Sequence, residues 1–122
     1  MLFQINIKKE ATENNFFRKV LYTGKHIQLV LMNLAPGEDI GEETHDTIDQ
    51  FFYFVQGQGE SIIEGRANPF MSGDAIFVPA GTLHNFRNTG TESLKLFTTY
   101  SPPNHPDGTI HETKEDAEKA EH

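Results

Sequence analysis

Turn residues recur at short intervals through the middle of the chain, and this spacing constrains the fold more than any other feature. Between the turns lie short runs rich in β-branched and aromatic residues, a pattern typical of strands. The strands expected from these runs cover residues 18–23, 27–35, 51–56, 60–64, 75–78, 84–88 and 94–100. Such regular punctuation favours an all-β, antiparallel sandwich or barrel.

The length of 122 residues is enough for one domain with a single core and too short for two. We therefore expect one domain over residues 1–122, with the barrel core at about 18–100. Residues 101–122 are expected to form a Pro-rich loop and an acidic tail that is helical over 114–120. Thr113 is the expected N-cap of that short helix.

The acidic residues are unevenly distributed, and they bear on possible partners. The formal net charge is −8, and six acidic residues but no basic residue fall within 37–50. Because sequence-independent nucleic-acid binding depends on Lys and Arg, we expect no nucleic-acid partner. No apolar run approaches the length of a membrane span and no secretory leader is visible, so we expect no membrane partner and a cytoplasmic location. The chain has no Cys, so any metal must be held by nitrogen and oxygen donors.

The strongest motif runs from residue 73 to residue 88 and reads GDAIFVPAGTLHNFRN. It resembles the second motif of the cupin superfamily, in which Gly, Pro-x-Gly, His and Asn stand at fixed spacings. Gly73, Pro79, Gly81, His84 and Asn88 meet every one of these positions. The Pro and Gly shape a tight turn that presents the histidine from the following strand. The alternative is that His84 is only a core histidine, as in cupins that lost the metal.

The first cupin motif lies upstream and is altered. Gly37, Glu43, His45, Gln50 and Gly57 stand at its spacings without a gap, so that Glu43 replaces the first His and Gln50 replaces the Glu. A second register makes His45 the first His and puts residue 47 in place of the second, at the cost of one spacing violation at each end. We prefer the ungapped register. His45, Gln50 and His84 belong to the site in both.

The resemblance implies a double-stranded β-helix, or jelly-roll, cupin barrel with a short C-terminal helix. It also implies one divalent metal ion, of the Mn, Fe, Zn or Ni type, held by Glu43, His45, Gln50 and His84. If Glu43 is not a ligand, it is a candidate catalytic general base. The open alternatives are that Glu43 lies on a solvated acidic loop and that Gln50 only hydrogen-bonds a neighbouring strand.

Strand alternation turns Phe52, Phe54 and Phe86 to the same face as Gln50 and His84, so these rings are candidate substrate-pocket residues. Ordinary core filling is the alternative for each ring. Because no cluster of Arg or Lys is expected to point inward, the cavity favours a hydrophobic or aromatic substrate over a phosphosugar. The remaining histidines, His26, 105, 111 and 122, are expected at the surface, with the one at 105 approaching the barrel mouth only if the tail folds back.

Two functions are compatible with these features. The first is a metal-dependent enzyme, dioxygenase-, decarboxylase- or isomerase-like, acting on a small organic molecule. The second is a non-catalytic module that binds or senses a small molecule, with the metal structural or absent. The resemblance also implies a homodimer, for which an exposed strand over residues 3–7 is the expected pairing edge.

Overall fold

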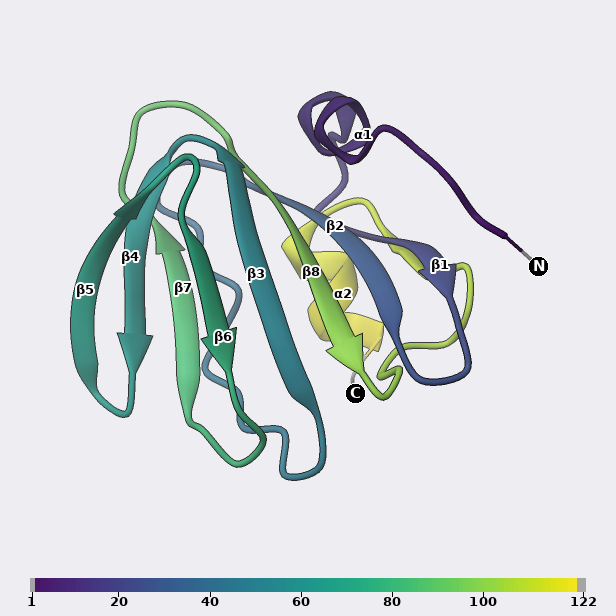
Figure 1. Cartoon of the computed structure of the whole chain (residues 1–122). Coiled ribbons are helices and arrows are strands. Elements are labelled where there is room, and N and C mark those ends of the chain that lie inside the picture. The colour runs from purple at the N-terminus through teal and green to yellow at the C-terminus, as the bar shows by residue number, and fades with distance from the viewer. Residues whose placement is uncertain (1, 121–122) are drawn as a thin grey trace.

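The structure is a computed structural model that describes residues 2–120 (Figure 1). Along the chain it contains α1 (Ile7–Glu13), β1 (Arg18–Thr23), β2 (Gln28–Leu34), β3 (Asp49–Gln56), β4 (Gln58–Ile63), β5 (Arg66–Met71), β6 (Ala75–Val78), β7 (His84–Asn88), β8 (Leu94–Ser101), β9 (Ile110–His111) and α2 (Lys114–Ala120). All seven expected strands are present, with ends that differ by up to two residues.

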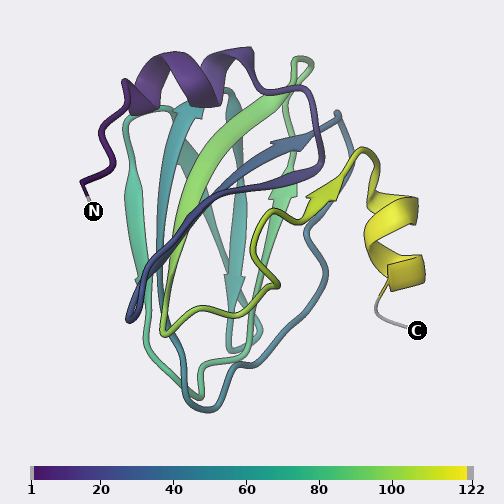
Figure 2. The same ribbon diagram turned by 90° about the vertical axis from the view of Figure 1, so that its right-hand side faces the viewer.

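The strands form two antiparallel sheets that face each other. One sheet has the order β6-β3-β8-β2-β1-β9 and the other has the order β5-β4-β7. Residues 37–43 add two isolated bridges to β7, Asp39 to Arg87 and Glu43 to His84. Figures 1 and 2 show the two layers curving around a shared interior, with α1 over one end and α2 at the side. The expected all-β jelly-roll barrel with a short C-terminal helix is confirmed.

Strand alternation divides the side chains between the interior and the outer face. On β3, Gln50, Phe52 and Phe54 are buried, while the side chains between them are only partly covered. On β8, the even-numbered residues from 94 to 100 are buried in the same way. The apolar interior residues form one core, which includes Val30, Met32, Leu34, Phe52, Phe54, Phe70, Phe86, Leu94 and Leu96.

The interior is polar at one end. In the register of the large sheet, Gln28 lies opposite Tyr100, and Tyr100 lies opposite Gln50 on the other side. Two residues further into the barrel, Val30, Thr98 and Phe52 occupy the same row. The apolar rows follow beyond them. The barrel interior therefore has an aromatic and aliphatic end and a polar end.

The N-terminal segment differs from the expectation. Residues 3–7 form no strand, and the prediction that they provide an exposed pairing edge is wrong. Asn6 instead caps α1, because its side-chain oxygen accepts a hydrogen bond from Lys9 N at 3.0 Å. The helix packs on the outer face of β8, β3 and β2, where it covers Leu31. Phe3 stacks on Tyr22 with ring centroids 4.7 Å apart.

Two strands were not expected. β5 pairs only with β4 and is an edge strand, which explains how it tolerates Pro69 and four consecutive exposed residues. β9 contains only two residues and pairs with β1. After it, Thr113 Oγ1 accepts a hydrogen bond from Asp116 N, so the expected cap of α2 is confirmed. Among the described residues, no helix is long and apolar enough to cross a membrane.

Candidate metal and ligand site

The two cupin-like motifs meet through a backbone bridge between Glu43 and His84. Glu43 N donates to His84 O at 2.9 Å, and His84 N donates to Glu43 O at 3.0 Å. Residues that exchange both hydrogen bonds in an antiparallel pair point their side chains to the same face. Because His84 is 4% exposed and faces the interior, the side chain of Glu43 is directed to that side as well.

His45 completes the contact between the motifs. Its Nε2 atom lies 2.8 Å from Glu43 Oε2, and its ring centroid lies 5.7 Å from that of His84. The contact with Glu43 is a close approach of two polar atoms and not a well-aligned hydrogen bond, since Nε2 has no partner at hydrogen-bonding geometry among the described residues. The exposed fractions of the His45 and Glu43 side chains are 15% and 29%, so this corner of the interior remains open to solvent.

Glu43 is ionised in this environment. Burial by itself raises the pKa of its carboxyl group. The side-chain contact with His45 and the electrostatic effects of His45, Arg18 and His84 together outweigh burial and hold the pKa of Glu43 below its ordinary value. A carboxylate is therefore available at this position as a metal ligand or as a proton acceptor.

His84 is held in one tautomer. Its Nδ1 atom lies 2.9 Å from the carbonyl oxygen of Thr82. A carbonyl oxygen can only accept, so Nδ1 carries a proton, and in the neutral imidazole the lone pair is on Nε2. Metal-binding histidines are commonly oriented in this way by a hydrogen bond from the other ring nitrogen. The turn formed by Pro79 and Gly81, the latter at φ 84°, leads the chain into this geometry.

Gln50 is buried, and only the nitrogen of its side-chain amide is hydrogen-bonded among the described residues. Its Nε2 atom donates to Thr98 Oγ1 at 3.1 Å, which fixes the orientation of the amide. Its Oε1 atom has no hydrogen-bond partner among the described residues, although the side chain is only 4% exposed. An unsatisfied buried acceptor costs on the order of 1–3 kcal/mol. That cost is removed if the oxygen binds a ligand such as a metal ion.

These residues fit a divalent cation by donor chemistry. Two imidazoles, one carboxylate and one amide oxygen are the nitrogen and oxygen donors that Mn, Fe, Ni or Zn accepts. The described residues nevertheless include no group of three or more His, Asp or Glu arranged closely enough to hold a metal. Three of the four expected donors, Glu43, His45 and His84, are linked by contacts, and the fourth, Gln50, is an amide.

The three phenylalanine rings that were candidates for the substrate pocket lie further into the barrel than these donors. Phe52, Phe54 and Phe86 are 0–1% exposed and belong to the core. The ring centroids of Phe52 and Phe86 each lie 6.1 Å from that of His84, whereas Phe54 stacks on Phe70 with ring centroids 3.8 Å apart. The first two rings therefore form an apolar wall beside the imidazole, and the third packs deeper.

One basic residue inside the barrel was not expected from the sequence. Arg18 is 2% exposed and shares the inward face of β1 with Val20. Its Nη1 atom lies 3.3 Å from Nδ1 of His111, opposite it on β9. The alternation of residues 18 and 20 was a usable signal, because it requires the guanidinium to enter the interior if Val20 does.

His105 also lies near the site and is half-buried, not fully at the surface; the tail folds back toward the barrel mouth, which is the condition that the sequence analysis gave for this. Its ring contacts that of Tyr100 edge to face, with ring centroids 5.0 Å apart, and the ring centroid of Tyr100 lies 6.0 Å from that of His45. Burial, with a smaller effect of the Arg18 charge, lowers the pKa of His105 to about 4, so the imidazole is neutral at pH 7. Its Nε2 atom is buried without a hydrogen-bond partner in the part of the chain that is described.

The loop that carries His105 is fixed by the buried side chain of Gln28. Gln28 Oε1 accepts hydrogen bonds from the backbone N–H groups of Asn104 and His105, and Gln28 Nε2 donates to His105 O and Thr23 Oγ1. The tail thus folds back over the barrel mouth. Of the remaining histidines, His26 is exposed as predicted, His111 is half-buried, and His122 lies outside the described residues.

The fold and the site together define a small β-barrel protein with a histidine- and carboxylate-containing site at one end of its interior. The sequence profile of the cupin domain family matches residues 30–100. The chain belongs to the cupin superfamily.

Several known proteins resemble this chain. The uncharacterized protein YrkC of Bacillus subtilis is 48% identical over 126 residues, which cover 98% of this chain and 67% of that protein. The crystal structure of BH2720 from Bacillus halodurans is 44% identical with a TM-score of 0.93, and the match covers 96% of this chain and 93% of that one. The structure of KdgF from a Halomonas species is 28% identical with a TM-score of 0.66, covering 71% and 78% of the two chains.

Proposed function

We propose that this cupin is a metal-dependent enzyme that acts on a small organic molecule at the polar end of its barrel. The observation that carries the proposal is the pair of buried acceptors. Because Nδ1 of His84 donates to Thr82 O, Nε2 is the acceptor of the neutral ring, and Gln50 Oε1 has no partner among the described residues. Glu43 and His45 adjoin His84 and supply the remaining donors.

Glu43, His45, Gln50 and His84 would hold a divalent ion of the Mn, Fe, Zn or Ni type, which would supply a Lewis acid for a carbonyl or enolate oxygen. The chain's own residues position the substrate. Phe52 and Phe86 present an apolar wall that excludes water beside His84. This wall is consistent with a hydrophobic or aromatic part of the substrate.

The second role of Glu43 follows from its contact with His45. If Glu43 is not a metal ligand, its ionised carboxylate accepts a proton from a substrate carbon or oxygen. Its side chain is 29% exposed, so the proton can leave to solvent. Reactions of the dioxygenase, decarboxylase and isomerase types are all compatible with one such base next to one Lewis acid.

The test of the proposal is metal binding by matched variants. Isothermal titration with Mn(II), Fe(II), Ni(II) and Zn(II) is expected to give one site per chain. Gln50→Leu, which removes the unpartnered oxygen with little change in volume, is expected to weaken binding at least tenfold. The matched control Gln58→Leu, at an exposed position of β4, is expected to leave binding unchanged. Equal affinities of the two variants would contradict the proposed ligand set.

The alternative is a binding or sensing cupin without catalysis. It is favoured by the amide at position 50, because an amide oxygen is a weaker metal donor than a carboxylate. Turnover distinguishes the two functions. Oxygen uptake and product formation are measured with the Fe(II)- or Mn(II)-loaded protein and small diketones, phenols and acids. Ligand-induced stabilisation without turnover by any metal form supports the sensing role.

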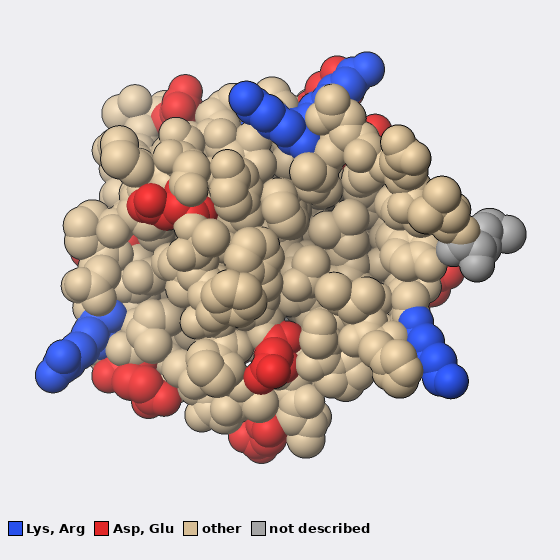
Figure 3. All heavy atoms as spheres, viewed as in Figure 1, with Lys and Arg blue, Asp and Glu red and all other residues tan. Residues whose placement is uncertain are grey.

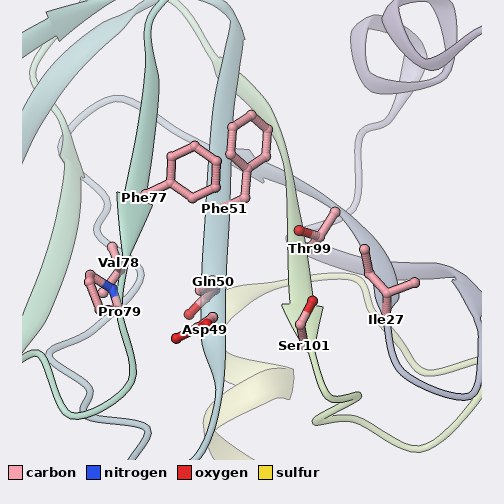
Figure 4. A pocket seen from close by; sticks show the side chains of 9 residues that line it. All are labelled: Ile27, Asp49, Gln50, Phe51, Phe77, Val78, Pro79, Thr99 and Ser101. Carbon is pink, nitrogen blue, oxygen red and sulfur yellow. The ribbon is translucent and has the colours of Figure 1, made fainter.

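We also propose that the chain forms a homodimer through the outer face of the large sheet. Phe51 contacts Phe77 at 4.8 Å on this face, and Phe77 is 75% exposed. The rings adjoin a groove of about 620 Å³, shown with Ile27 and Thr99 in Figure 4. In Figure 3 most charged side chains of this view lie around the rim. Asp49 is the one charged residue among those that line this groove, and two chains of net charge −8 repel each other least where a face with so few charges meets its copy.

A further inference from the structure

The segment of residues 37–43 pairs with β7 in two registers. The bridges that fix these registers are Asp39 to Arg87 and Glu43 to His84. From the first bridge to the second, the segment advances four residues while β7 advances three. The segment therefore contains one extra residue, which makes it a β-bulge in which Gly41 and Glu42 together lie opposite Asn85.

This bulge determines which of two neighbouring glutamates faces the interior. A shift of one residue in register turns the side chains of a strand to the opposite face. Without the extra residue, the first register would continue and Glu42 would lie opposite His84. In the structure Glu42 is exposed, whereas Glu43 lies opposite His84 with its side chain directed to the interior.

The side chain of Asn85 holds the bulge. Its Oδ1 atom accepts hydrogen bonds from Gly41 N at 3.0 Å and from Phe86 N at 2.8 Å. Ile40 N donates to Phe86 O at 3.0 Å, and in a regular antiparallel ladder Phe86 N would donate to Ile40 O in return. The bulge interrupts this exchange, and Asn85 supplies one acceptor for N–H groups of both segments.

The orientation of the Asn85 amide is fixed from the outer side. Its Nδ2 atom donates to Asp39 Oδ2 at 2.9 Å. A carboxylate only accepts hydrogen bonds, so Asp39 selects the amide orientation in which Oδ1 faces the bulge. Asp39 in turn pairs with Lys114 of α2. The C-terminal helix therefore supports the segment that carries Glu43, through two side chains that never reach the interior.

We propose that Asn85 is a positioning residue of the site: by holding the bulge, it directs Glu43 instead of Glu42 to the interior beside His84. The inference rests on the proposed function, because Glu43 is one of the expected metal donors. Its geometric content is the direction of one side chain, which can be measured in the metal-free protein.

The experiment measures which of the two positions faces the solvent. The chain has no Cys, so Glu42→Cys and Glu43→Cys each introduce a single thiol, whose reaction with an aromatic disulfide reagent is followed in chelator-treated protein. Each rate is divided by the rate of the same variant in urea, which removes the intrinsic reactivity of the thiol. The Glu42→Cys thiol is expected to react about tenfold faster than the Glu43→Cys thiol, because reactivity depends on exposure.

Variants assign this difference to the bulge. Asn85→Ala is expected to bring the two rates within about twofold of each other, because both registers are then populated. Gly41→Ala is expected to act in the same direction, since Gly41 adopts φ 111°, which residues with a Cβ rarely adopt. This second variant keeps the test decisive if Asn85→Ala does not fold. The matched control Asn68→Ala, at an exposed position of β5, is expected to leave the ratio unchanged.

Deletion of Glu42 distinguishes positioning from a general loss of stability. The deletion removes the extra residue, so a regular ladder places Glu43 opposite His84 and there is no bulge left to hold. The Glu43→Cys thiol is therefore expected to be protected in the deletion variant, both with and without Asn85→Ala. If Asn85→Ala only destabilised the barrel, removing a residue would not restore the protection, and that result would overturn the positioning role.

Titration of Mn(II) separates this inference from the proposed function. Glu43→Gln is expected to weaken Mn(II) binding and Glu42→Gln is not, whereas in the presence of Asn85→Ala the two effects are expected to become similar. A thiol ratio that responds to Asn85→Ala in a protein that binds no Mn(II) supports the positioning of Glu43 and refutes the metal-dependent enzyme. Equal thiol rates in the presence of Asn85, or a ratio that neither Asn85→Ala nor Gly41→Ala changes, overturn the inference whatever the metal affinity is.

Discussion

The partly buried imidazole of His105 leads to a specific prediction about stability in acid. In the unfolded chain this histidine titrates near its ordinary pKa of 6.5, whereas burial lowers the pKa to about 4 in the folded protein. Between these values the unfolded state binds the proton more readily than the folded state. The contribution of His105 to stability is therefore complete above pH 6.5 and is lost progressively as the pH falls toward 4.

The size of the effect follows from the shift. A shift of one pKa unit corresponds to about 1.4 kcal/mol, so the difference between 6.5 and 4 corresponds to about 3 kcal/mol over the full range. About 2 kcal/mol of this falls between pH 7 and pH 5. The His105 ring is only partly buried, and screening by solvent reduces the expected loss to about 1–2 kcal/mol.

The assay compares wild type with His105→Phe by urea unfolding at pH 7 and pH 5, followed by circular dichroism. Phe keeps the ring against Tyr100 and does not titrate. The wild type is expected to lose about 1–2 kcal/mol more than the variant between the two pH values, because the carboxylates of the two proteins titrate alike. His26→Phe, at an exposed position, is the control and is expected to follow the wild type. Identical pH dependence of wild type and His105→Phe would refute the burial of a neutral imidazole.

Three further predictions concern the rest of the fold. Asp39→Asn is expected to lower the free energy of unfolding by less than about 1 kcal/mol and to speed hydrogen exchange in α2, because Asp39 pairs with Lys114 of that helix. Burial acts to raise the pKa of Asp39, but hydrogen bonds and the Lys114 charge keep this pKa below its ordinary value. The protection of α2 in the wild type is therefore also expected to fall in strong acid, where Asp39 is protonated. Gly59→Ala is expected to lower the melting temperature by several degrees in a thermal scan, since a Cβ there would lie 2.5 Å from the ring of Phe70, and an unchanged value would contradict the packing. Phe77→Asp is expected to shift a dimer to a monomer in sedimentation velocity with little loss of stability, and a dimer that persists would exclude the proposed face.

The sequence was a good guide to the barrel because strand period and turn chemistry are local. Alternation correctly placed Gln50, Phe52 and Phe54 on one face, and the spacing of Gly73 and His84 identified the family. It misled at the N-terminus, where Phe3 and Ile5 alternate as in a strand. A helix of seven residues has little intrinsic stability, and α1 depends on its cap and on packing against the sheet.

Only part of the candidate site could be predicted from the sequence. The spacing of Glu43, His45, Gln50 and His84 is visible in the chain, and the structure joins three of these residues by direct contacts. His105 comes to the site through Gln28, which lies 77 residues away and has no motif around it. Contacts of this range depend on the tertiary fold, so no local pattern indicates them.

The bridge between Glu43 and His84 also affects how readily this site can change its chemistry. Both hydrogen bonds of the bridge are made by backbone atoms, so the two positions stay opposite each other whatever side chain occupies position 43. A histidine could replace the glutamate there, restoring the usual cupin donor, without disturbing the barrel. The donor atom at position 43 can therefore be changed without changing the backbone that holds it, and this position is suited to exchanging one metal donor for another by design.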